Sequence, residues 1–241
     1  MTGIRRWIAV VALLLVLAGA AVAFLVRGTV SPDADRAAPM TSTSPSASPS
    51  STERPVTPEV VFLGDSWTVG VGATAGQGYA PLVAEQLGWE YEELGVSGSG
   101  YLSPGAAAPY AERIDAAVAV DPDLIVVQGS LNDSRSDPGQ LDRAAADTLA
   151  RLQATAGDGR AVLVIGAPDT PGTDPAVIER INAAIAAAAG AAGFAFVNPA
   201  QENWTDPADP AIWADPLHPN DAGHRLLAEA LVPLMQAALD G

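Results

Sequence analysis

Short strand-like runs that alternate with alanine-rich stretches constrain the fold of this chain most strongly. Runs such as Leu-Ile-Val-Val and Val-Leu-Val-Ile contain no alternating polar residues, which is typical of strands buried on both faces of a parallel sheet. Strands are predicted at 60–63, 90–95, 124–127, 161–166 and 194–198, and helices at 80–87, 110–120, 141–156, 175–191 and 221–239. This order predicts the α/β class: a three-layer α/β/α sandwich around a five-stranded parallel sheet.

The N-terminus has the pattern of a membrane segment. Residues 7–26 carry no charge and follow the pair Arg5 and Arg6, so they match the length of a bilayer-spanning helix whose arginines stay on the cytoplasmic side. Residues 1–27 are expected to be a signal anchor, or a signal peptide that is cleaved after Ala23. The rest of the chain is then expected outside the cytoplasm, on the cell membrane or secreted.

Residues 28–58 are rich in Ser, Thr and Pro and predict a disordered linker, because they carry too few apolar groups to offset the entropy of ordering. The catalytic domain is then expected at 59–241. From Val56 onward the chain has seven arginines against 25 acids, a formal charge of −18. Such a surface repels phosphate backbones and disfavours nucleic-acid binding. The sequence has no cysteine, which excludes disulfides and thiolate metal sites.

A candidate nucleophile follows the first predicted strand. Gly64, Asp65 and Ser66 come directly after the apolar run and are typical of a sharp turn. Ser66 is thereby expected at the carboxyl edge of the sheet, where open α/β folds hold their active sites. Because Asp and Ser are also common turn residues, the prediction depends on a base, an acid and oxyanion donors elsewhere.

The two histidines of the sequence, His218 and His224, both lie near the start of the last predicted helix. Serine hydrolysis near neutral pH needs an imidazole to take the hydroxyl proton and a carboxylate to orient that imidazole. Asp215 lies three residues before His218 and can supply the carboxylate from the same loop. His224 falls inside the helix start, where a packing or capping role is expected.

Candidate oxyanion donors follow the second and third strands. Asn132 lies just after the third strand, where its side-chain amide can donate to a developing oxyanion. The run Gly95 to Tyr101 contains glycines at 98 and 100, whose backbone N–H groups can approach a ligand closely. Gly98 is the preferred donor, and Gly100 is the alternative.

Together, Gly64-Asp65-Ser66, Gly98, Asn132 and the Asp215 to His218 loop resemble the SGNH (GDSL-like) hydrolase family over roughly Val60 to Leu239. The resemblance implies a flavodoxin-like sheet, with Ser66 as nucleophile, His218 as base and Asp215 as its partner. It also implies an oxyanion hole made by the backbone N–H groups of Ser66 and Gly98 and by the Asn132 amide. Members of the family need no metal or organic cofactor.

Two positions depart from the family pattern. Trp67 follows the nucleophile where the family more often has leucine, which affects the size of the acyl pocket. The third block has Ser130 where the family has glycine, and Gly129 precedes it by one residue. The displaced glycine affects the conformation of the local turn more than the role of Asn132.

The expected function is hydrolysis of carboxylic esters, such as O-acyl esters of sugars or lipids, through an acyl-enzyme on Ser66. A membrane-tethered binding module without activity and an acyltransferase with the same triad are the alternatives. Four aromatic residues are candidates for substrate contact, by stacking on sugars or lining an acyl channel, or else pack under the loops: Trp67, Tyr101, Trp204 and Trp213.

Overall fold

The computed structural model describes residues 57–157 and 159–240. The predicted membrane segment 1–27 and almost all of the predicted linker 28–58 lie outside the described residues. Within the described residues, no helix combines the length and apolar character that a membrane span requires.

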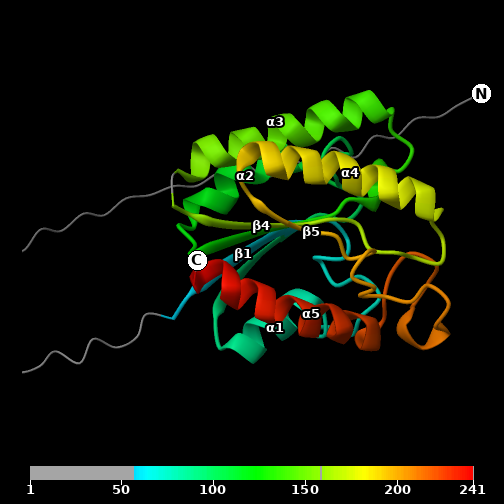
Figure 1. The fold of residues 1–241 in the computed structure, drawn as a ribbon. Helices are drawn as coiled ribbons and strands as arrows, with labels where there is room; N and C mark the ends of the chain where they lie inside the picture. Colours follow the sequence, from blue (N-terminus) through cyan, green and yellow to red (C-terminus); the bar gives the residue numbers. More distant parts are fainter. Residues whose placement is uncertain (1–56, 158, 241) are drawn as a thin grey trace, which may run out of the picture. The chain divides into compact units, whose positions relative to one another are not determined.

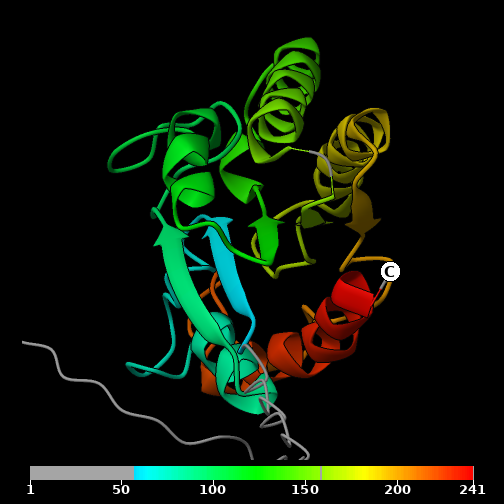
Figure 2. The ribbon, with the colours of Figure 1, turned by 90° about the vertical axis from the view of Figure 1, so that its left-hand side faces the viewer.

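The described residues form a three-layer α/β/α sandwich (Figure 1). Five parallel strands in the order β2-β1-β3-β4-β5 make the central sheet. Helices α1 and α5 cover one face and α2, α3 and α4 cover the other, as Figure 2 shows from a second direction. The strands are β1 (Glu59–Gly64), β2 (Glu90–Gly95), β3 (Leu124–Gln128), β4 (Ala161–Ile165) and β5 (Ala195–Val197). The helices are α1 (Tyr79–Leu87), α2 (Tyr110–Ala119), α3 (Pro138–Ala156), α4 (Pro175–Ala192) and α5 (Asp221–Asp240), with short 3₁₀ turns at Leu131–Asp133 and Pro210–Ile212. The predicted α/β sandwich is confirmed.

Strand burial follows position in the sheet. The apolar side chains of β1, β3 and β4 are buried on both faces of the sheet, as their unbroken hydrophobic runs predict. Strand β2 pairs with β1 alone and lies at the edge, so Glu90, Glu92 and Glu93 are exposed there. Charged side chains on an edge strand discourage pairing with another chain.

The strand order brings the loops after β1 and β3 together. Strand β1 has β2 on one side and β3 on the other, so the order reverses at β1. Leu63 of β1 is aligned with Val127 of β3, and the loops that follow these strands therefore start next to each other. Ligands of open α/β sheets bind at such a switch point, outside the carboxyl ends of the strands.

Helix α3 begins a full turn or nearly so before its predicted start. Helix α3 starts at Pro138 rather than at residue 141, because the Asp137 side chain accepts a hydrogen bond from the backbone N–H of Gln140 and caps the first turn. Proline at the first helical position needs no hydrogen-bond partner for its nitrogen. The Asp-Pro pair is the local signal for this start.

Candidate active site

Ser66 lies in a tight turn directly after β1. The backbone N–H of Val71 donates to the Ser66 carbonyl at 2.9 Å, and the N–H of Trp67 donates to Oδ1 of Asp65 at 2.9 Å. These bonds close the turn on both sides of Ser66. The serine is therefore held at the carboxyl edge of the sheet, as predicted.

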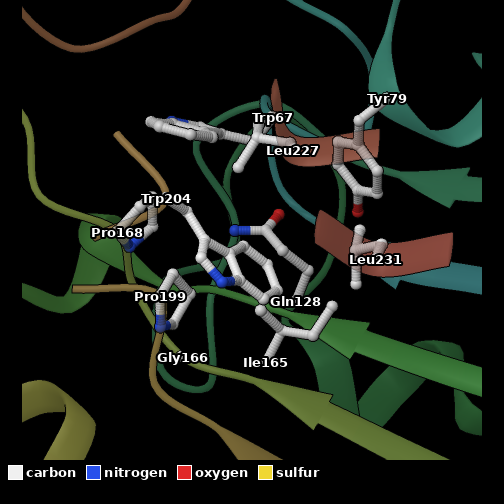
Figure 3. A pocket seen from close by; sticks show the side chains of 10 residues that line it. All are labelled: Trp67, Tyr79, Gln128, Ile165, Gly166, Pro168, Pro199, Trp204, Leu227 and Leu231. Atoms are coloured by element: carbon white, nitrogen blue, oxygen red, sulfur yellow. The ribbon is translucent and has the colours of Figure 1, made fainter. Parts of the chain in front are cut away.

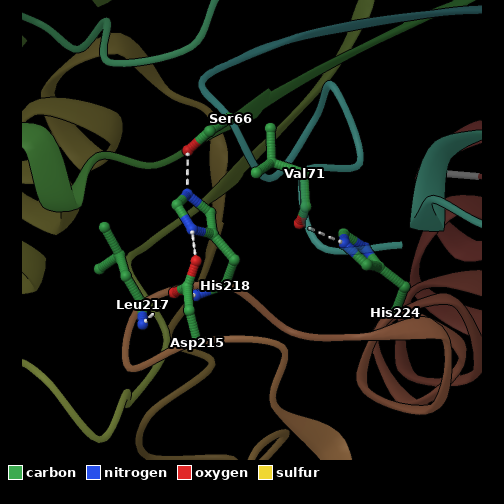
Figure 4. Close-up of polar contacts among 6 residues, drawn as sticks. All are labelled: Ser66, Val71, Asp215, Leu217, His218 and His224. Atoms are coloured by element: carbon green, nitrogen blue, oxygen red, sulfur yellow. Dashed lines mark hydrogen bonds and ion pairs between the residues drawn. The ribbon is translucent and has the colours of Figure 1, made fainter. Parts of the chain in front are cut away.

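The structure joins Ser66, His218 and Asp215 in one hydrogen-bonded row (Figure 4). The His218 Nε2 atom lies 3.0 Å from the Ser66 Oγ atom, and the His218 Nδ1 atom lies 2.8 Å from Oδ2 of Asp215. In the tautomer that carries its proton on Nδ1, His218 donates to Asp215 and leaves Nε2 free to accept the serine proton. The row has the order that activation of a serine hydroxyl requires.

Asp215 is itself oriented by its own loop. Its Oδ1 atom accepts hydrogen bonds from the backbone N–H groups of Leu217 at 2.7 Å and His218 at 2.8 Å. Burial alone would raise the pKa of Asp215, but the hydrogen bonds from the His218 ring and from the two amides bring that pKa below its ordinary value. Asp215 is therefore a carboxylate at neutral pH, as an orienting group must be.

The loop after the nucleophile packs directly on the loop that carries His218. Gly72 has a φ of +96°, and a β-carbon there would collide with the Pro219 carbonyl oxygen. Further along, Thr74 donates through its backbone N–H and its hydroxyl to the Asp221 carboxylate, at 2.6 and 2.9 Å. These contacts hold the two loops at a fixed separation, which the bond between Ser66 and His218 requires.

The predicted oxyanion donors come from two loops that are joined to β1. The backbone N–H of Val96 donates to the Gly64 carbonyl at 3.1 Å, and the Ser99 Oγ atom lies 3.3 Å from the same oxygen. This places the loop with Gly98 beside the nucleophile turn. The Asn132 amide nitrogen donates to the Ser99 carbonyl at 2.8 Å and lies 3.4 Å from Oδ2 of Asp65. One amide hydrogen is thus firmly bonded and the other is only weakly engaged.

Backbone hydrogen bonding distinguishes the two candidate glycines. The N–H of Gly100 donates to the Ser103 carbonyl at 2.8 Å, so it is already used inside a turn. Gly98 has a φ of +78°, which glycine adopts readily, and its N–H makes no hydrogen bond within 57–157 and 159–240. Gly98 is therefore the better candidate donor.

The shifted glycine in the third block has a simple explanation. Gly129 has a φ of +119° and lies so close to the Asp65 carboxylate that a β-carbon would come within 2.9 Å of it. Ser130 has an extended backbone with φ −136°, which any residue adopts. The conformation that needs glycine therefore falls at 129, and serine is accommodated at 130.

Asp133 connects two loops of the site, and no role was predicted for it from the sequence. Its buried carboxylate accepts hydrogen bonds from the backbone N–H groups of Tyr101 at 2.8 Å and Ser103 at 3.0 Å, and from the Ser103 hydroxyl at 2.9 Å. It therefore links the loop after β2 to the loop after β3. An acid directly after Asn132 is the only local signal for this role.

Asp65 is buried behind the nucleophile, with 1% of its surface exposed. The pKa of its carboxyl is raised to about 7, chiefly by burial. The hydrogen bond from the backbone N–H of Trp67 and the charge of Arg113 oppose this rise, and the charge of Asp133 adds to it. With its amide nitrogen turned toward Asp65, the Gln128 side chain donates to Oδ1 at 3.1 Å. Asp65 shapes the turn and stands outside the row of Ser66 and His218.

Of the four aromatic residues proposed to contact substrate, two are buried in the protein interior, and Trp204 and Trp213 are partly buried. Trp67 is 2% exposed and Tyr101 is 3% exposed, and Trp213 packs edge-on against Trp67 at 6.1 Å between ring centroids. Trp67 and Trp204 face a cavity of about 10 Å³ (Figure 3), which has room for roughly one water molecule. Trp67 and Tyr101 thus pack under the loops, the alternative that the sequence left open.

His224 has a structural environment, as expected from its place in the helix start. It is fully buried, its Nδ1 atom accepts from the backbone N–H of Tyr79 at 3.3 Å, and its Nε2 atom lies 3.3 Å from the Val71 carbonyl (Figure 4). Burial lowers the pKa of His224. A neutral ring with both nitrogens bonded to backbone joins α5 to α1 and to the nucleophile loop.

A groove with about 420 Å³ of free space opens beside Asn132. It lies between the loops that follow β3 and β4 and the loop that carries His218. The loop after β4 and the His218 loop touch where the backbone N–H of Gly172 donates to the Pro216 carbonyl at 2.7 Å. The groove is lined in part by Asn132, Ser134, Arg135, Thr173, Pro216 and Leu217. Its contact with Asn132 makes it the candidate substrate groove.

Among the described residues, no cluster of His, Cys, Asp and Glu is arranged to hold a metal ion.

Comparison with known proteins identifies the family of this chain. Residues 62–226 match the GDSL-like lipase/acylhydrolase family. The chain is 34% identical over 196 residues to a GDSL lipase of Mycobacterium tuberculosis, which covers 76% of this chain and 83% of that protein.

Solved structures share the fold. The structure of TesA superposes with a TM-score of 0.62 at 24% identity, over 75% of this chain and 99% of that one. A carbohydrate acetylesterase from Sinorhizobium meliloti superposes with a TM-score of 0.59 at 16% identity, over 75% of this chain and 99% of that one. The match over most of the domain and the identity to the mycobacterial lipase show that this chain belongs to the GDSL-like lipase/acylhydrolase family and is an ester hydrolase.

Proposed function

We propose that this protein hydrolyses O-acyl esters of sugars or lipids through an acyl-enzyme on Ser66. The observation that carries the proposal is the row in which the Ser66 hydroxyl, the His218 imidazole and the Asp215 carboxylate are spaced at 3.0 and 2.8 Å. At the 3.0 Å separation of Ser66 Oγ and His218 Nε2 the serine proton can pass directly to the imidazole.

The first step is attack of Ser66 Oγ on the ester carbonyl carbon, while Nε2 of His218 takes the hydroxyl proton. The C–O bond to the alcohol then breaks, and the alcohol leaves with the proton that His218 returns. In the second step a water attacks the acyl-enzyme, His218 takes its proton, and Ser66 is released with its proton restored. Asp215 stabilises the imidazolium in both steps.

The negative charge on the carbonyl oxygen would be held by the backbone N–H groups of Ser66 and Gly98 and by the Asn132 amide. The Asn132 amide is held by its 2.8 Å bond to the Ser99 carbonyl, and its second hydrogen, which is only weakly engaged with Asp65 at 3.4 Å, is the one available to the oxyanion. A donor held in place before the reaction stabilises the transition state without reorganisation.

The proposal also places the enzyme outside the cytoplasm, on the sequence of residues 1–27 alone. An uncharged segment after Arg5 and Arg6 would anchor the domain in the membrane, or release it if cleaved after Ala23. N-terminal sequencing of the mature protein distinguishes the two, and an intact Met1 on a cytoplasmic protein would contradict both.

The proposal is tested by comparing Ser66→Ala with the parent protein on 4-nitrophenyl acetate and on a fluorophosphonate probe, which labels an activated serine. The variant is expected to lose both hydrolysis and labelling. Ser136→Ala is the matched control, because it removes a hydroxyl from another loop of the same domain. Hydrolysis that survives in folded Ser66→Ala would refute the assignment of the nucleophile.

A further inference from the structure

The candidate substrate groove differs in charge from the rest of the domain. From Val56 onward the chain has 25 acids and seven arginines, yet the residues that line this groove include Arg135 and no acid. Three other cavities of the described residues are lined by carboxylates: one by Asp121 and Asp123, one by Glu202, and one by Asp169 and Glu179. The groove beside Asn132 therefore has one cationic side chain and no carboxylate in its lining.

The guanidinium of Arg135 is not engaged with the neighbouring acids. Arg135 is exposed, and within 57–157 and 159–240 it makes no ion pair and no hydrogen bond by its side chain. The carboxylate of Asp133 is bonded to the loop around Ser103, and that of Asp137 caps α3. By contrast, Arg160 in another cavity is paired with Asp121 at 2.6 Å.

The loop after β4 offers the groove a second donor. The Thr173 hydroxyl accepts a hydrogen bond from the Thr170 hydroxyl at 2.9 Å, so its own proton is free for a ligand in the groove. Leu217 and Pro216 add apolar surface on the side of the His218 loop. A guanidinium and a hydroxyl around one groove form a donor set that fits carboxylate or phosphate oxygens.

We propose that this groove binds an anionic group of the ester substrate, a carboxylate or a phosphate, and that Arg135 is the residue that selects such substrates. The inference rests on the proposed function, because it assigns a substrate class to the same site. Arg135 contacts the bound substrate away from the reacting carbonyl. It therefore acts on binding, and its loss changes KM more than kcat.

The acidic domain explains why such a residue matters. A formal charge of −18 from Val56 onward repels anionic esters at a distance, so an anionic substrate needs a local cation at the site. Salt screens both the repulsion of an anionic ester by the acidic surface and its attraction to Arg135. The selectivity carried by Arg135 is thus largest at low ionic strength.

The test measures kcat and KM for matched pairs of esters that differ in one anionic group. On the acyl side, mono-4-nitrophenyl succinate is compared with 4-nitrophenyl butyrate. On the alcohol side, 4-acetoxybenzoate is compared with 4-acetoxybenzamide, and the acetate ester of glycerol phosphate with that of glycerol. A preference for one carboxylate pair or for the phosphate pair identifies which anion the groove takes and on which side of the ester it lies.

Arg135→Gln is expected to raise KM about tenfold for the preferred anionic ester, in line with loss of a charge-assisted hydrogen bond, and to leave its neutral partner within twofold. Arg135→Lys should retain part of the preference. The matched control is Arg143→Gln, which makes the same charge change on α3 outside the groove and should leave both members of each pair unchanged.

Two outcomes overturn the inference: equal effects of Arg135→Gln on the charged and neutral members of every pair, or equal effects of Arg143→Gln and Arg135→Gln. Neither outcome touches the proposed hydrolysis, which is judged separately by neutral-ester activity in the parent protein and its loss in Ser66→Ala.

Discussion

The side-chain amide of Asn132 donates to the backbone carbonyl of Ser99 at 2.8 Å. This bond joins the loop after β3 to the loop after β2, so that the proposed oxyanion donors Asn132 and Gly98 belong to one connected unit. The buried Asp133 carboxylate connects the same two loops through Tyr101 and Ser103. The geometry of the hole therefore depends on contacts between loops as well as on each donor.

Asn132→Ala is expected to lower kcat on 4-nitrophenyl acetate by two to three orders of magnitude, because loss of one oxyanion donor removes about 3 kcal/mol of transition-state stabilisation. KM should change little, since the interaction is made in the transition state. Steady-state kinetics check both values, with thermal unfolding to show that the loops remain folded. A kcat within fivefold of the parent would show that Asn132 is not a donor.

Asp215→Asn is expected to lower kcat by about three to four orders of magnitude, because an amide next to Nδ1 stabilises the wrong tautomer of His218. The variant keeps a side-chain oxygen that accepts from the N–H groups of Leu217 and His218, so the loop should keep its shape. Steady-state kinetics measure kcat, and a crystal structure of the variant shows whether the loop keeps its shape. Near-normal turnover with the loop intact would exclude Asp215 as the orienting acid.

Asp65→Asn is expected to change how stability depends on pH. Burial raises the pKa of the folded-state carboxyl to about 7 from 3.8, so its contribution to stability is full below about pH 4 and is lost as the pH rises to about 7. The amide of asparagine does not titrate, so the variant does not lose stability in this way as the pH rises.

Its free energy of unfolding relative to the parent should therefore rise between pH 4 and 8, by at most about 4 kcal/mol, the equivalent of a three-unit pKa shift. Urea unfolding across this range measures the difference. The control is Asp142→Asn, which makes the same change at an exposed position of α3. A difference between Asp65→Asn and the parent that is constant with pH would contradict the raised pKa.

Asp133→Ala is expected to destabilise the domain by about 3 kcal/mol, because it leaves the buried N–H of Tyr101 and the partly buried N–H of Ser103 without their acceptor. Activity should fall as well, since these contacts hold the loop next to Gly98. Urea unfolding gives the stability change, and Asp142→Ala is the exposed control. A change below 0.5 kcal/mol would mean that other acceptors replace the carboxylate.

Several features were readable from the sequence because their physical cause is local. The unbroken apolar runs of β3 and β4 reflect burial on both faces of the sheet, and glycine and proline mark the ends of helices. Asp215 and His218 lie three residues apart, so one stiff loop can bring carboxylate and imidazole together. The family pattern then identified Ser66, Gly98 and Asn132 as the positions to examine.

Only the tertiary structure decided the relations between distant segments. The bond of 3.0 Å between Ser66 and His218 spans 152 positions in the sequence, and it depends on how the loops after β1 and before α5 pack at Gly72. The choice between Gly98 and Gly100 depended on which N–H already had a partner. The burial of Trp67 and Tyr101 depended on what packs over them. Local sequence determines strands, turns and residue types, whereas distances across the active site arise from packing between elements that the sequence keeps far apart.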